Sequence, residues 1–280
     1  MDAYPVFDLV MPVTMQYVAD NMGVQTHSGT LERVVDPVKG NKPVFEFTHQ
    51  YRKAERNELG RDKWWERKPE NHYAYWVSFY VPKNFTYSPT NTPLNAASFV
   101  NVSNEETLAT HYMGNTRQPG NPLWITQWHA SKYGPPPIGL TLYGSTTPGK
   151  LTLAIEEHVS RYSYVNSPFQ TEINYGQWYS VKLLAKWEKN YYSDALSAGY
   201  WEFYLDNKLV LKYSGQTIPN ADIYENLAPA YKFGVYTPAY RDSSAEAFRI
   251  LHKGIVMAAG PTKDIANLKL VRVLGAKGER

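Results

Sequence analysis

Short hydrophobic segments, continuous or alternating with polar residues, recur along most of the chain, and turn-forming residues separate them. β-Branched and aromatic residues are frequent in these segments, which is typical of strands. The pattern predicts strands over residues 44–58, 74–81, 123–129, 138–143, 150–156, 177–187, 200–205, 208–213, 232–236, 254–258 and 267–274. A short helix is predicted only for residues 13–22. Asp206 and Asn207, between two predicted strands, are a signal for a two-residue hairpin turn.

The succession of these segments predicts the fold class. Strands follow one another at short spacing, and no amphipathic pattern of ten or more residues indicates a long helix. This arrangement favours an all-β sandwich. The sequence has no internal repeat, low-complexity tract or evident linker, so we expect residues 1–280 to form a single domain. Residues 82–122 are rich in Asn, Thr and Pro and are predicted to form a loop, whose length is uncommon unless it is functional.

The composition narrows the functional classes without choosing one. Of the 280 residues, 43% are hydrophobic, which is enough for a sizeable core, and 15% are aromatic. Tyr and Trp suit sugar rings, but they also fill β-sandwich cores. The net charge of +3 is too small to indicate nucleic acid as a partner. The absence of Cys excludes disulfides and thiolate metal sites.

No segment of the sequence is typical of a membrane protein. No run of 18 or more apolar residues is present, so no membrane span is expected. The first residues lack the basic and apolar regions of a signal peptide. We therefore expect the protein either to be intracellular or to have lost a leader.

The segment 123–129 combines a strand pattern with two polar side chains of chemical interest. Strict alternation places Gln127 and His129 on one face together with Ile125. The other face then carries Trp124, Thr126 and Trp128. An amide and an imidazole two residues apart can converge on a single small group. The alternative is that both are on the solvated side of a half-buried sheet, since strands commonly have one polar face.

Two further stretches combine a strand pattern with charged or unusual residues. Residues 52–61 carry four basic and two acidic side chains, either for function or as a charged sheet edge that blocks aggregation. In residues 231–236, Lys232, Gly234 and Tyr236 alternate onto one face. Gly234 would leave a gap through which a ligand could approach the backbone. The alternative is an ordinary strand with a tyrosine at its exposed end.

Together, these stretches resemble motifs of the jelly-roll polysaccharide lyases, which include alginate lyases, glucuronan lyases and heparinase-type enzymes. Residues 56–59 (Arg-Asn-Glu-Leu) are similar to the family's Arg-Ser/Thr-Glu-Leu-Arg, residues 127–129 (Gln-Trp-His) to its Gln-Ile/Val-His, and residues 231–236 to its Tyr-Phe-Lys-Ala-Gly-x-Tyr. The order is the same, and the resemblance spans roughly residues 40–260. Gly60 replaces the second Arg and the third motif is one residue shorter, which favours the glucuronan-lyase and heparinase-like group over a strict alginate lyase.

The resemblance implies an all-β, concanavalin-like β-jelly-roll sandwich with a concave substrate groove, and cleavage of a uronic-acid polysaccharide by β-elimination. Glucuronan is the expected substrate, with alginate second. The C5 proton can leave only if the adjacent carboxylate is neutralised and the enolate-like charge is stabilised. By resemblance, Arg56 and Gln127 neutralise the carboxylate, while His129 and Tyr236 are the base and the acid. If proton and leaving group are on the same face, Tyr236 alone can serve both roles.

The resemblance also implies what surrounds the reacting groups. Glu58 would orient Arg56. The other predicted substrate-binding residues are Arg52, Lys232, Trp128 and Tyr133. The mechanism requires no cofactor; some members carry a structural calcium, for which the sequence shows no ligand loop. The expected partner is an anionic polysaccharide, with no nucleic acid or membrane, and the expected state is a secreted or periplasmic monomer.

Two other functional classes fit the same fold. A non-catalytic carbohydrate-binding jelly roll would keep aromatic and basic residues, but it would not need Gln127, His129 and Tyr236 together. A glycoside hydrolase needs two carboxylates ~5 to ~9.5 Å apart. The Glu-x-Asp-x-x-Glu strand that supplies them in laminarinase-like enzymes is missing. His49, beside Phe47 on an apolar face, is expected to be a core histidine.

Overall fold

The computed structural model of the protein describes residues 6–8, 23–26, 29–49, 55–60, 72–85, 123–129, 136–158, 165–188, 199–215, 217, 229–237 and 248–263. The predicted helix at 13–22, the predicted loop at 82–122 and the predicted strand at 267–274 lie wholly or largely outside these residues. Within the part described, no helix is long and apolar enough to cross a membrane.

The described residues form strands and turns, without an α-helix. The strands are β1 (Val6–Asp8), β2 (Gly23–Thr26), β3 (Leu31–Val35), β4 (Pro43–His49), β5 (Glu55–Gly60), β6 (His72–Tyr80), β7 (Leu123–His129), β8 (Ile138–Gly144), β9 (Lys150–His158), β10 (Val165–Asn174), β11 (Trp178–Lys186), β12 (Gly199–Leu205), β13 (Lys208–Gly215), β14 (Ala230–Thr237) and β15 (Phe248–Gly260). The prediction of an all-β fold is confirmed. The hairpin turn between β12 and β13 is also confirmed, because Asp206 and Asn207 both have positive φ, 48° and 67°.

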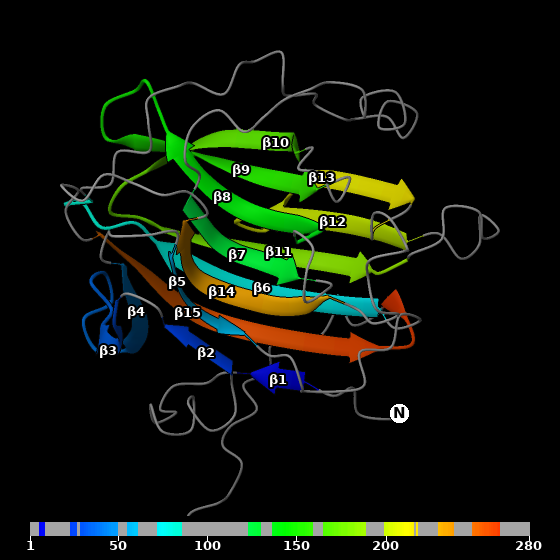
Figure 1. Cartoon of the computed structure of the whole chain (residues 1–280), viewed down its shortest axis with the longest axis horizontal. Coiled ribbons are helices and arrows are strands. Elements are labelled where there is room, and N and C mark those ends of the chain that lie inside the picture. The colour runs from blue at the N-terminus through cyan, green and yellow to red at the C-terminus, as the bar shows by residue number, and fades with distance from the viewer. Residues whose placement is uncertain are drawn as a thin grey trace, which may run out of the picture.

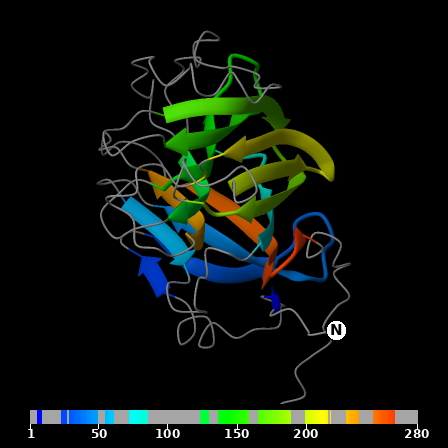
Figure 2. The same ribbon diagram turned by 90° about the vertical axis from the view of Figure 1, so that its right-hand side faces the viewer.

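The strands form two antiparallel sheets. The back sheet has the order β13-β12-β11-β6-β15-β4-β3, with β1 also paired to β15, and the front sheet has the order β10-β9-β8-β7-β14-β5-β2. In Figure 1 the front sheet lies nearer to the viewer than the back sheet. Figure 2 shows the two layers after a turn of 90°. One hydrophobic cluster drawn from both sheets fills the space between them.

Trp128 lies at the centre of this core and is 1% exposed. Its ring stacks on Tyr231 of the front sheet, with centroids 5.5 Å apart, and meets the edges of Tyr75 and Phe203 of the back sheet at 5.6 and 5.8 Å. The prediction that Trp128 contacts substrate is therefore wrong. Alternation along β7 directs the Trp128 side chain into the core. There its large aromatic surface is removed from water, which is favourable.

The single strand predicted over residues 44–58 is wrong as well. β4 ends at His49 in the back sheet, and β5 begins at Glu55 in the front sheet, so the chain changes sheets between them. Phe47 of β4 and Leu59 of β5 enter the same core from opposite sides. The prediction that His49 is a core residue is confirmed, since it is 0% exposed.

A β-bulge in β7 changes the predicted faces of that strand. The pairing of β7 with β8 shifts register between Trp124 and Thr126. Ile125 is the extra residue and joins the core instead of the face of Gln127. Trp124, in contrast, is directly opposite Tyr236 of β14 and so shares the outward face of the front sheet.

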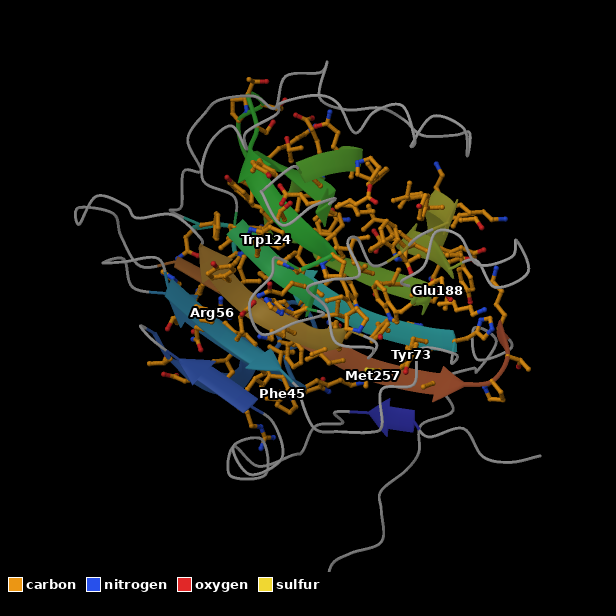
Figure 3. The ribbon with its side chains drawn as sticks, turned by 45° about the vertical axis from the view of Figure 1, so that its right-hand side comes forward. Phe45, Arg56, Tyr73, Trp124, Glu188 and Met257 are labelled. Carbon is orange, nitrogen blue, oxygen red and sulfur yellow. The ribbon has the colours of Figure 1, made fainter. Side chains whose placement is uncertain are left out.

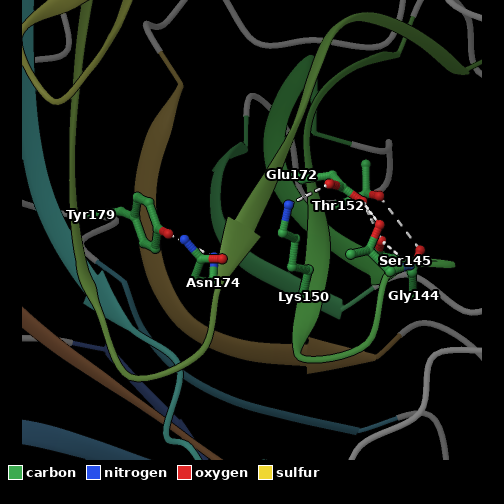
Figure 4. A network of polar contacts seen from close by, with 8 residues as sticks. Gly144, Ser145, Lys150, Thr152, Glu172, Asn174 and Tyr179 are labelled. Carbon is green, nitrogen blue, oxygen red and sulfur yellow. Dashed lines mark hydrogen bonds and ion pairs between the residues drawn. The ribbon is translucent and has the colours of Figure 1, made fainter.

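A network of polar contacts joins β10, at one edge of the front sheet, to the turn between β8 and β9 (Figure 4). Glu172 of β10 accepts hydrogen bonds from Lys150 Nζ at 2.8 Å and from the hydroxyls of Ser145 and Thr147, both at 2.6 Å. These bonds lower the pKa of Glu172 to about 2. The contacts hold the turn between β8 and β9 against β10, a strand that the sequence did not predict.

Candidate active site

The three stretches singled out from the sequence lie on neighbouring strands. β5, β14 and β7 are adjacent in the front sheet, although they come from distant parts of the chain (Figure 1). Both pairs are antiparallel, so directly opposite residues carry their side chains on the same face. Leu59, Phe233 and Trp128 of these strands belong to the core. The polar side chains alternate with them and therefore lie on the opposite side of the front sheet, which we call the outer face.

The strand register places the predicted site residues in a row along this outer face. Arg56 of β5 is directly opposite Tyr236 of β14. Gln127 of β7 is directly opposite Lys232 of β14. Arg56 and Tyr236 are partly exposed, whereas Gln127 is 1% and Lys232 is 7% exposed.

Glu58 connects the two ends of this row. Its Oε1 accepts a hydrogen bond from Gln127 Nε2 at 2.5 Å, and its Oε2 lies 3.8 Å from Arg56 Nη1. β14 runs between these two strands, and its Gly234 is directly opposite Glu58. Both carboxyl oxygens thus face protein groups. Glu58 therefore contacts both Arg56 and Gln127, and its predicted role in orienting Arg56 stays a prediction.

The burial of Glu58 controls its protonation. The side chain is 1% exposed, and burial raises the pKa of Glu58 above its usual value. The charge of Arg56, the hydrogen bond from Gln127 and the charge of Lys232 oppose this rise in part. Because the charged form is disfavoured, the carboxyl holds its proton to higher pH than a free glutamate does.

Arg56 and Tyr236 form the second contact of the site. The guanidinium carbon of Arg56 lies 4.4 Å from the centroid of the Tyr236 ring, within the range of a cation–π interaction. Trp124 flanks Tyr236 from β7, on the other side. Figure 3 shows Trp124 and Arg56 on β7 and β5, with β14 between them. Sequence reasoning missed Trp124, and the only sign of the bulge is the run of three hydrophobic residues, 123–125.

His129 is separated from Tyr236 along the strands. It is opposite Ala230, six residues before Tyr236 on β14, which corresponds to roughly 20 Å of strand. The register therefore separates His129 and Tyr236 along the strands, and their division into a histidine base and a tyrosine acid stays a prediction. His129 is partly exposed and lies beyond Gln127 on the same face.

The remaining predictions concern residues or ions that the structure does not test. Arg52 and Tyr133 lie outside the described residues. Among the residues described, no group of three His, Asp or Glu side chains could hold a metal ion. A structural calcium stays a prediction.

The space at Gly234 is filled by the protein itself. A Cβ added there would collide with the carbonyl oxygen of Asn57 and would lie 2.8 Å from Glu58 Cα and 3.1 Å from Phe47 Cδ1. Gly234 also has a φ of 138°, which side chains rarely tolerate. The predicted gap for a ligand is thus wrong, and the glycine instead allows β14 and β5 to approach closely.

A family comparison decides what this site belongs to. The family described as "Polysaccharide lyase" matches residues 17–253, most of the chain and all three motif strands. The chain belongs to the polysaccharide lyase family. The prediction from the motifs is thereby confirmed, and the protein is an enzyme of this class. No curated protein matches the lyase.

Solved structures of alginate lyases share the fold of this lyase. Alginate lyase Aly36B aligns with a TM-score of 0.53 at 12% identity, over 91% of this chain and 97% of its own. A double mutant of Aly36B in complex with alginate tetrasaccharide aligns with a TM-score of 0.50, at 12% identity and the same coverage. The exolytic alginate lyase AlyA5 from Zobellia galactanivorans gives 0.49 at 13% identity, over 87% and 96%. The Aly36B alignments show the fold alone, and the predicted jelly-roll sandwich is confirmed.

The site of the lyase thus has one end with a guanidinium and an aromatic ring and another end with an amide and an ammonium group. Arg56 and Tyr236 form the first, and Gln127 with Lys232 forms the second. Glu58 links the two ends through its hydrogen bond with Gln127 and its ion pair with Arg56. A guanidinium, an ammonium and an amide can all donate hydrogen bonds to a carboxylate.

Proposed function

We propose that this lyase cleaves a polymer of D-glucuronate by β-elimination, with Tyr236 as both the base and the acid. The observation that carries the proposal is the position of Tyr236. Its ring lies beneath the Arg56 guanidinium, and Arg56 is in turn ion-paired to Glu58, which holds Gln127. A proton-transferring group therefore lies against one cationic donor, and Glu58 connects that donor to the amide of Gln127. His129, roughly 20 Å of strand away, is not needed at that bond.

The proposed reaction proceeds through a stabilised enolate. Arg56 and Gln127 hold the carboxylate of the sugar, which lowers the cost of charge that develops on it when the C5 proton leaves. Tyr236, as the phenolate, takes this proton. The electron pair of the C5–H bond becomes the C4–C5 double bond, and the C4–O bond breaks. The departing oxygen takes the proton back from Tyr236, which returns the phenolate.

One residue in both roles restricts the stereochemistry of the substrate. Tyr236 can reach the C5 proton and the O4 leaving group only if they are on the same face of the sugar. This holds for D-glucuronate and D-mannuronate and fails for L-guluronate, L-iduronate and D-galacturonate. We therefore place glucuronan first and the mannuronate blocks of alginate second. The alginate complex of the Aly36B mutant is consistent with this second choice. We also propose a secreted or periplasmic location, where such polymers are found.

Absorbance near 235 nm tests the proposal, because β-elimination leaves a conjugated double bond that absorbs there. The protein is incubated in parallel with glucuronan, polymannuronate, polyguluronate, hyaluronan and heparin. We expect the fastest rise with glucuronan, a slower one with polymannuronate, and none with polyguluronate. A rate with polyguluronate equal to that with polymannuronate would rule out a single tyrosine acting on one face.

A further inference from the structure

One buried histidine links the back sheet to the strand that carries Tyr236. His252 of β15 is 0% exposed and packs against the rings of Phe47 and Phe233, at centroid separations of 5.2 and 6.1 Å. Its Nε2 lies 3.2 Å from the carbonyl oxygen of Gly234 in β14. A carbonyl oxygen can only accept, so Nε2 carries a proton and donates it to this bond.

The Gly234 carbonyl points out of the front sheet, towards His252. The pairing of β14 with β7 shifts register between Phe233 and Tyr236, and Gly234 has its φ of 138° within this interval. A strand carbonyl normally points along the sheet to a neighbouring strand. This one points across the core to the opposite sheet instead. A buried carbonyl needs a donor, and His252 supplies it.

His252 takes no part in the proton transfers proposed above. It lies on the core side of the front sheet, whereas Tyr236 is on the outer face. Burial lowers the pKa of His252 to about 3, against a smaller opposite effect of the bond to Gly234, so the imidazole is neutral at neutral pH. Its Nδ1 makes no hydrogen bond within the described part of the chain. Its one polar contact there is the bond to the bulge.

We propose that His252 is a positioning residue whose hydrogen bond to Gly234 fixes the bulge in β14 and thereby the placement of Tyr236 against Arg56. A bulge re-aims the side chains that follow it, and Tyr236 is two residues after Gly234. Without the donor, the Gly234 peptide can rotate back towards β7, and Tyr236 moves relative to the guanidinium. The inference rests on the proposed function, because it assigns Tyr236 to the reaction.

Three variants separate positioning from mere packing. His252→Phe keeps an aromatic ring in the core but removes the donor. His252→Gln places an amide N–H about as far from the backbone as Nε2 and so can restore the bond. Ile250→Ala, two residues earlier on the same core face of β15, is the control, since Ile250 is 0% exposed and has no polar side-chain atom. Its cavity lowers the melting temperature without touching the Gly234 carbonyl.

We expect kcat to fall about 10- to 100-fold in His252→Phe with KM within about twofold, because small misplacements of a reacting group cost this much. His252→Gln is expected to keep kcat within about threefold, and Ile250→Ala within about twofold, despite a lowered melting temperature. Equal kcat values in His252→Phe and Ile250→Ala would overturn the proposal. So would failure of His252→Gln to restore kcat while it restores the melting temperature.

A second measurement keeps this inference distinct from the proposed function. Hydrogen exchange is followed in the peptide that covers residues 231–237. We expect exchange at least about tenfold faster in His252→Phe than in Ile250→Ala, because only the first releases the bulge. This result can be obtained even if no polymer is cleaved. Equal protection in the two variants would show that His252 does not hold the bulge.

Discussion

Gln127 on β7 donates a hydrogen bond to Glu58 on β5, over the intervening strand β14. Strands two positions apart in a sheet are about 10 Å from each other, so only two long side chains that lean together can make this contact. Glu58 also pairs with Arg56. The positions of both groups that are proposed to neutralise the substrate carboxylate therefore depend on one buried carboxyl group.

Replacing Glu58 with Gln tests this dependence. An amide oxygen still accepts from Gln127, but it carries no charge for Arg56, so we expect kcat to fall about tenfold. The pKa of Glu58 is raised in the native state, mainly by burial, so the wild type loses stability as pH rises above the usual value of 4.5. We expect Glu58→Gln to lack this loss. The free energy of unfolding of both proteins is measured in urea at pH 4 and pH 8. A variant clearly less stable than the wild type at pH 8 would contradict this expectation.

Gly234 is predicted to tolerate no side chain. Its φ is 138°, and an added Cβ would collide with the Asn57 carbonyl oxygen. We expect Gly234→Ala to lower the free energy of unfolding by about 2 kcal/mol or more and to abolish most activity. Gly149→Ala is the matched control, because Gly149 also has positive φ, 75°, but has nothing within 4 Å of an added Cβ. It should cost about 1 kcal/mol and leave kcat unchanged.

His252 is predicted to make the native state sensitive to acid. Burial lowers the pKa of His252 to about 3, whereas an unfolded histidine titrates near 6.5. Between these values the unfolded chain binds the proton and the native chain does not. Stability should therefore fall as pH drops from 6.5 towards 3, by at most about 1.4 kcal/mol per pH unit from this group. The free energy of unfolding of wild type and of His252→Gln is measured by denaturant titration at several pH values in this interval. We expect the two pH dependences to diverge, and parallel dependences would argue against a neutral buried histidine.

Asp36, which follows β3, is predicted to stabilise the back sheet through contacts with β11 and β15. It accepts bonds from Lys253 Nζ at 2.7 Å and Trp178 Nε1 at 3.0 Å, and from the Val38 amide. Burial alone would raise the pKa of Asp36, but these bonds lower it to about 2. We expect Asp36→Asn to cost about 1 to 3 kcal/mol at pH 7, without a change in kcat.

The pH dependence of this loss provides the check. Because the pKa of Asp36 is lowered in the native state, its stabilisation is present above the usual pKa of 3.8 and disappears as pH falls through about 2. The difference in unfolding free energy between wild type and Asp36→Asn should therefore shrink between pH 4 and pH 2. A constant difference over this range would mean that the charge of Asp36 is not involved.

The sequence predicted the elements that depend on local pattern. The strand at 123–129 has its predicted bounds, and the hairpin at Asp206 and Asn207 follows from a preference of these residues for positive φ. The motifs at residues 56–59, 127–129 and 231–236 also indicated the family correctly. Their adjacency on β5, β14 and β7 follows from the sheet order, which differs from the order of the motifs along the chain.

The sequence could not predict what depends on register and on the core. The bulge that turns Ile125 inward and Trp124 outward has no clear signal in the sequence, since either residue suits either face. The register that separates His129 from Tyr236 arises from the pairing of strands about a hundred residues apart. The bond from His252 to Gly234 crosses between the sheets, and no spacing in the sequence marks it.

We propose that Tyr236, and not His129, transfers the protons. The most direct measurement is the initial rate of absorbance rise at 235 nm, on the polymer that the wild type cleaves fastest, for Tyr236→Phe and His129→Ala. We expect a loss of about 10³-fold or more for Tyr236→Phe, which keeps the ring under Arg56 but removes the hydroxyl, and of at most about tenfold for His129→Ala. If His129→Ala is as inactive as Tyr236→Phe, the histidine acts at the same bond and the account is wrong.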